Sequence, residues 1–205
     1  MTGQAVQRRI RQRGQGLIEM ALVVPLIILL FLGVYTAADL SNNKDTVEHA
    51  VRQGARLAAE IGNDGYKPGT KPWTCQAQDN DPCHADAEII KAVMPILSAQ
   101  LPHAVVQEID VYQPAPCPNG TSWGSGCPPD NGAYQSGDLL NQYNADGTLK
   151  TGSPQSYTLD KRTQQHPNEA SIAVRVTFQY TSPTLKMFST TLSQYADIRL
   201  APTFT

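Results

Sequence analysis

Residues 20–38 read MALVVPLIILLFLGVYTAA, a run of 19 residues without a charged side chain. A helix of this length spans about 28 Å at a rise of about 1.5 Å per residue, close to the hydrocarbon thickness of a bilayer. Four arginines precede the run: Arg8, Arg9, Arg11 and Arg13. Because short segments rich in arginine stay in the cytoplasm, the sequence predicts one membrane-spanning helix with a cytoplasmic N-terminus and an exported remainder.

This topology divides the 205 residues into a basic cytoplasmic leader at 1–16, a transmembrane helix at 17–38 and an exported domain at 39–205. The formal charge of the whole chain is −2. The domain is mildly acidic, so the basic residues of the leader favour membrane orientation over nucleic-acid binding, which needs a basic patch on the folded part. The domain is long enough to form a hydrophobic core of its own.

A cleaved secretory signal peptide is the main alternative for this segment. The small residues Thr36, Ala37 and Ala38 would allow a cut before Asp39. Against it, the apolar run is long for a signal peptide, Glu19 interrupts its start, and residues 39–61 continue in helical register. Pro25 lies inside the predicted span and is expected to kink it modestly.

The cytoplasmic border of the run, at residues 13–20, contains two glycines and a glutamate at positions that would suit proteolytic processing. A cut after Gly14 would make Gln15 the new N-terminus and Glu19 the fifth residue of the mature chain. Glycine gives a peptidase an unhindered backbone. A carboxylate at the edge of the apolar helix has a desolvation cost that a cationic partner would offset. Equally, Glu19 is compatible with an interfacial residue that reaches water.

Residues 13–25, RGQGLIEMALVVP, resemble the R-G-Q-A-x-V-E-F-A-L-V-L-P opening of the TadE-like family, which consists of minor pseudopilins of tight-adherence (Flp) pili and related secretion machines. Residues 50–59, AVRQGARLAA, resemble the A-x-R-x-G-A-R-x-A-A segment of that family. Residues 171–201 resemble its C-terminal part more loosely. The departures include Gly16 and Met20, which replace the usual alanine and aromatic residue.

The resemblance implies a pilin-like protein of the bacterial inner membrane. Its expected partners are prepilin peptidase, other pilin subunits and the pilus assembly platform. Cleavage would follow Gly14, and Glu19 would pair with the α-amine of a neighbouring subunit. The motif residues assigned to assembly and helix packing are Glu19, Pro25, Gly54 and Arg56.

The exported domain is predicted to be α+β, with helices on one face of a small antiparallel sheet. One narrow apolar stripe extends the first helix to Ile61, and it consists of Val47, Ala50, Val51, Gly54, Ala55, Ala58 and Ile61. A second helix is predicted at 84–101, with a kink or an early stop at Pro95. Strands are predicted at 105–112, 171–181 and 194–200.

The middle of the chain is predicted to be loop-rich at 113–168 and braced by disulfides. Four cysteines allow three pairings, and the local one, Cys75–Cys83 with Cys117–Cys127, is favoured. Their spacings do not match the short knuckles that zinc favours. Residues 144–147, NADG, form a turn signal that can close a hairpin.

No catalytic motif stands out, so neither an enzyme nor a cofactor or metal site is expected. Asp79, Asp81 and Asp86 are interpreted as a solvated acidic loop rather than a calcium site. The sequence reveals no partner for His103. The alternative to a pseudopilin is a single-pass, membrane-anchored ligand-binding, sensor or adhesion domain, which would need neither Gly14 nor Glu19.

Overall fold

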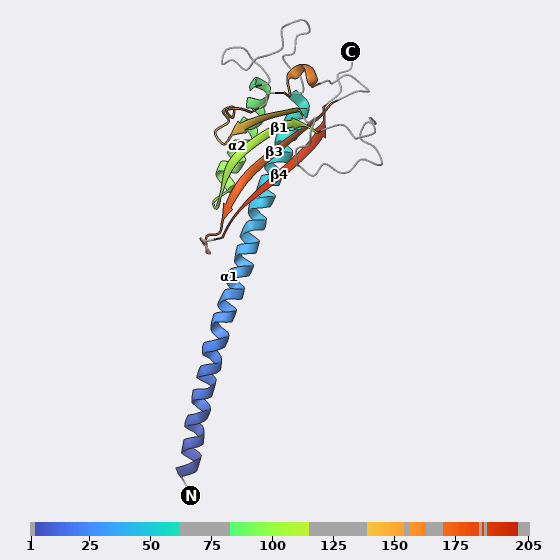
Figure 1. The fold of residues 1–205 in the computed structure, drawn as a ribbon. Coiled ribbons are helices and arrows are strands. Elements are labelled where there is room, and N and C mark those ends of the chain that lie inside the picture. Colours follow the sequence, from blue (N-terminus) through green and yellow to red (C-terminus); the bar gives the residue numbers. More distant parts are fainter. Residues whose placement is uncertain are drawn as a thin grey trace.

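The computed structural model describes residues 3–61, 83–114, 139–153, 156–162, 170–184, 186 and 188–200. For residues 3–15, 83, 84 and 160 it describes the backbone only. The elements are α1 (Gly3–Ile61), α2 (Cys83–Gln100), β1 (Ala104–Gln113), β2 (Leu139–Asn144), the 3-10 helix η1 (Leu159–Lys161), β3 (Ser171–Thr181) and β4 (Ser189–Arg199). Figure 1 shows a long helix that carries a small sheet near its C-terminal end.

Helix α1 contains 59 residues and continues without a break through Pro25, which gives a length of about 88 Å. Its N-terminal half stands clear of the rest of the chain, and its C-terminal half packs on the sheet (Figure 1). We call residues 39–61 together with α2 and the four strands the sheet domain. The predicted helix from the apolar run to Ile61 is therefore confirmed.

The sheet is antiparallel, with strand order β2-β1-β3-β4. The predicted α+β class is confirmed, and β3 has the predicted bounds. Strand β4 begins at Ser189, five residues before the predicted start at 194. Its added residues are mostly serine and threonine, which give no clear alternation of apolar and polar residues but pair in register with the end of β3.

The core lies between the two helices and one face of the sheet. Side chains of the α1 stripe are buried against α2 and β3, which confirms the stripe predicted from the sequence. Gly54 marks the closest approach, because a Cβ atom there would lie 2.5 Å from Cγ2 of Val93 and 3.6 Å from side-chain atoms of Ile89 and Val174. Glycine therefore allows α1, α2 and β3 to meet.

Helix α2 forms close to its predicted bounds and corrects one prediction, that for Asp86. Of the kink or early stop predicted at Pro95, the early stop does not occur, because the helix continues to Gln100. Asp86, predicted to belong to a solvated acidic loop, is fully buried in the first turn of α2. Its Oδ1 atom lies 2.6 Å from Nη2 of the buried Arg162, and its Oδ2 atom accepts hydrogen bonds from Asn141 at 2.9 Å and the Tyr143 hydroxyl at 2.7 Å. The carboxylate is buried because three distant donors surround it.

The loop-rich middle contributes to the sheet as well. The predicted turn is present: Gly147 has φ +82° and donates its N–H to the carbonyl of Asn144 at 2.9 Å. Tyr143 then pairs with Leu149 across this hairpin. Strand β2, which precedes the turn, was not predicted, since its two leucines are followed by mixed polar residues.

The disulfide predictions lie outside the described residues. Cys75, Cys117 and Cys127 are not among those residues, and Cys83 is described only as the first backbone residue of α2.

Candidate assembly helix and its junction with the domain

The N-terminal half of α1 is apolar, and the other described residues leave it exposed. Its large hydrophobic side chains are exposed at every angle around the helix: Leu17, Ile18, Met20, Leu22, Val23, Val24, Leu26, Ile27, Ile28, Leu29, Leu30, Phe31, Val34 and Tyr35. An 18-residue window here has a mean hydropathy of 2.8, and none of it is buried. By length and composition this helix can span a membrane.

The predicted cleavage and assembly residues lie at the start of this apolar surface. Gly14 and Gln15 are in α1, and Glu19 follows Gln15 by about one helical turn and is exposed. Pro25 is exposed farther along the same helix. Glu19 is the only carboxylate between residue 3 and Ala38. A single acid therefore precedes a helix surface that is otherwise apolar.

Gly54 and Arg56 lie elsewhere, about 50 Å farther along α1 than Glu19. Gly54 is buried against α2 and β3 within the chain. Arg56 is exposed and lines an open groove of about 500 Å³ between α1 and β4. The structure therefore does not bring these two residues together with Glu19, although the family resemblance assigned all three to assembly and helix packing.

The groove is polar and charged. Glu48, Arg52 and Arg56 line it from α1, and residues 194–198 line it from β4, an edge strand of the sheet. Glu48 and Arg52, one turn apart, form an ion pair. Among the described residues, no group of three or more His, Cys, Asp or Glu side chains could hold a metal ion.

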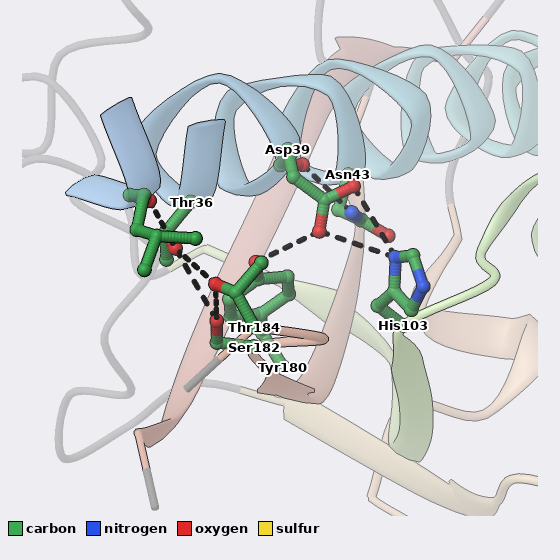
Figure 2. A network of polar contacts seen from close by, with 8 residues as sticks. Thr36, Asp39, Asn43, His103, Tyr180, Ser182 and Thr184 are labelled. Atoms are coloured by element: carbon green, nitrogen blue, oxygen red, sulfur yellow. Dashed lines mark hydrogen bonds and ion pairs between the residues drawn. The ribbon is translucent and has the colours of Figure 1, made fainter. Parts of the chain in front are cut away.

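A polar network joins the end of the apolar run to the sheet domain (Figure 2). Asp39 is its centre: Oδ2 accepts a hydrogen bond from the Tyr180 hydroxyl at 2.7 Å and lies 3.2 Å from Nδ1 of His103. Burial, followed by the bond to Asp39, raises the pKa of Tyr180 to about 12. The Nδ2 group of Asn43 donates to the Asp39 carbonyl at 2.7 Å.

Three hydroxyls extend this network toward the N-terminus. The Thr36 hydroxyl donates to the Leu32 carbonyl at 2.9 Å and also lies 2.9 Å from the Thr184 hydroxyl and 3.3 Å from that of Ser182. The Ser182 and Thr184 hydroxyls are 3.1 Å apart. Helix α1 is thus tied to the β3–β4 connection as soon as its apolar run ends.

Sequence reasoning missed this junction because its members are far apart in the chain. His103 lies 64 residues and Tyr180 141 residues from Asp39. The one available signal was position: Asp39 is the first charged residue after the apolar run. A carboxylate at that place, facing a domain, is expected to find a donor.

Comparison with known proteins supports the resemblance noted in the sequence. The family model described as TadE-like protein matches residues 14–56. No curated protein and no solved structure matches the chain. The matched segment covers the exposed apolar half of α1, the junction residue Asp39 and most of the buried stripe. Over residues 14–56 the chain is therefore similar to TadE-like proteins.

Proposed function

We propose that this chain is a single-pass inner-membrane protein that acts as a minor pseudopilin in assembly of a Tad (Flp) pilus or a related secretion apparatus. In this account the N-terminal half of α1 first spans the membrane and then packs laterally against other pilin subunits. The sheet domain lies on the exported side, and the protein has no enzymatic activity.

The observation that carries the proposal is the exposed apolar half of α1 within the segment that matches the TadE-like family. Apolar side chains all around a helix need apolar surroundings on every side. Lipid supplies them while the protein is in the membrane, and the apolar helices of other subunits supply them in an assembly. One surface therefore serves both states.

Glu19 would fix the orientation and the axial position of one subunit's helix relative to the helix of its neighbour. If a prepilin peptidase cuts after Gly14, the Gln15 α-amine becomes a cation about one turn from Glu19. Between two subunits, the carboxylate of one and the amine of the other form a pair in surroundings of low polarity, where such a pair is strong. Since the amine exists only after cleavage, assembly would depend on processing.

Glu19→Ala tests this mechanism in the source bacterium. We expect pili counted by electron microscopy to fall at least tenfold, with an unchanged amount of the protein in the membrane. Glu60→Ala is the matched control, because Glu60 is an exposed glutamate in the packed half of the same helix. Wild-type piliation in Glu19→Ala cells that hold normal amounts of the protein would contradict the mechanism.

The groove between α1 and β4 favours one alternative, a membrane-anchored binding or sensor domain. Its charged lining would suit a polar ligand or an extended peptide at the edge of β4. That function needs neither Gly14 nor Glu19. A Glu19→Ala variant with full piliation, and an Arg56→Glu variant that loses the cellular phenotype, would together favour the alternative.

A further inference from the structure

The β3–β4 connection forms a tip at the end of the sheet domain that faces the N-terminal half of α1 (Figure 1). The described residues of this connection are Ser182, Pro183, Thr184, Lys186 and Phe188, and we call them the hairpin tip. The N–H of Ser182 donates to the carbonyl of Phe188 at 3.0 Å and closes it. The tip follows the last pair of the β3–β4 ladder, Thr181 with Ser189, so it lies at that end of the sheet.

The hairpin tip lies at the level where the apolar run of α1 ends. Thr36 is two residues, or about 3 Å of helix rise, before the end of that run at Ala38. Its hydroxyl contacts those of Ser182 and Thr184. When the run spans a bilayer, these contacts hold the tip at the depth of the lipid headgroups.

The composition of this end of the domain fits that depth. Outside the apolar half of α1, two large hydrophobic side chains of the described residues are exposed. Val105 has an exposed fraction of 69%, and Phe188 has one of 45%. Val105 pairs with Gln179, next to the pair of Ala104 with Tyr180, so it lies at the same end of the sheet. Lys186 is exposed in the tip.

Exposed apolar and basic residues together are typical of surfaces that contact lipid headgroups. An aromatic ring prefers the boundary between headgroups and acyl chains, and a lysine attracts anionic lipids. Tyr35, also exposed, places a second aromatic ring in α1 one residue before Thr36.

We propose that the hairpin tip and Val105 form a second membrane contact beside α1, with Phe188 in the interfacial region and Lys186 at the lipid phosphates. This inference rests on the proposed spanning of the membrane by α1. Two contacts prevent the sheet domain from rotating or tilting freely about one helix. They therefore fix which side of α1 faces lipid and which remains open to other subunits.

Tryptophan quenching in lipid nanodiscs tests the contact on the full chain. Trp73 and Trp123 are first replaced by phenylalanine, so that a single tryptophan can be introduced. Three single-tryptophan chains are then compared: Phe188→Trp in the tip, Phe31→Trp in the apolar half of α1, and Glu60→Trp, about 36 Å of helix beyond Thr36. The nanodiscs contain phosphatidylcholine and phosphatidylglycerol with brominated acyl chains.

We expect at least twofold quenching at positions 31 and 188 and none at 60. Quenching at 31 with none at 188 would overturn the membrane contact alone. Absence of quenching at both would overturn the spanning helix as well, so the two failures are distinguishable.

Lys186→Glu in the Phe188→Trp chain tests the lipid charge. The parent chain should lose quenching at 188 when phosphatidylglycerol is omitted, and the Lys186→Glu chain should show the same reduced quenching with and without it. Unchanged quenching in all four samples would overturn the role of Lys186.

Discussion

The two halves of α1 share one continuous helix but differ in what surrounds them. From residue 17 to Tyr35 the large apolar side chains point in all directions and are exposed. From Val47 to Ala58 the buried residues follow one stripe, and charged residues occupy the other faces. The first pattern is typical of a helix in apolar surroundings such as lipid or other helices, and the second is typical of a helix that packs on the core of its own domain.

The change between the halves lies within the 12 residues from Tyr35 to Val47, about three turns, and this interval contains the α1 residues of the polar network of Figure 2. Thr36 lies in the last turn of the apolar run, and Asp39 is the first charged residue after the run. Thr36 bonds to Thr184 in the β3–β4 connection, and Asp39 bonds to Tyr180 of β3. These bonds hold α1 against the β3–β4 end of the sheet at the point where the apolar run ends.

The packed half depends on α2, which is fixed by the buried pair of Asp86 and Arg162. Asp86→Ala leaves the Arg162 guanidinium buried without its carboxylate. We expect the free energy of unfolding of the sheet domain to fall by about 3–5 kcal/mol. The apolar half should remain helical, because none of its contacts is changed.

Urea unfolding in detergent micelles measures both parts, with near-UV circular dichroism for the domain and far-UV for the helix. Asp45→Ala is the control, since Asp45 is exposed on the same molecule. Equal stability of the two variants would show that the domain does not depend on this pair.

Two glycines of α1 give a matched test of the two halves. A Cβ atom at Gly54 would lie 2.5 Å from Val93, whereas one at Gly33 meets no atom within 4 Å. The neighbours of Gly54 are β-branched and have few alternative rotamers. Gly54→Val should therefore lower the free energy of unfolding by about 2–3 kcal/mol.

Gly33→Val should leave the stability of the sheet domain unchanged in the same urea titration. If Gly33→Val destabilised the domain as much as Gly54→Val, the two halves would not be structurally independent.

At the junction we expect a smaller effect. Tyr180→Phe removes the hydroxyl that donates to Asp39 at 2.7 Å, while His103 remains beside the carboxylate. A hydrogen bond to a charged group contributes about 1.5 kcal/mol at the lower end of its range, and we expect a loss of that size. Thermal unfolding in micelles provides the measurement. Tyr35→Phe, at an exposed tyrosine, should not change the midpoint, and a loss equal to that of Tyr180→Phe would contradict the assignment.

Local pattern was enough to predict much of this fold. The apolar run, the stripe up to Ile61 and the alternation in β3 are periodic over many residues, so each indicated its element correctly. The hairpin turn at Asn144–Gly147 was evident because glycine favours the positive φ found at Gly147.

What the sequence could not predict depends on contacts between distant segments. Asp86 looked like part of an acidic loop because Arg162, 76 residues away, gives no local sign of pairing with it. His103 looked isolated for the same reason, since its partner Asp39 is 64 residues away in the chain. The roles of Gly54 and Arg56 also separate only in three dimensions, where one is buried and the other lines a groove.

The mature N-terminus shows whether the chain is processed as a pseudopilin. Mass spectrometry of the protein from isolated membranes, with and without prepilin peptidase, would identify it. The account predicts a chain that begins at Gln15 in cells with the peptidase and at the uncleaved start in cells without it. A mature chain that begins at Asp39 would contradict the account, because the apolar half of α1 would then be absent.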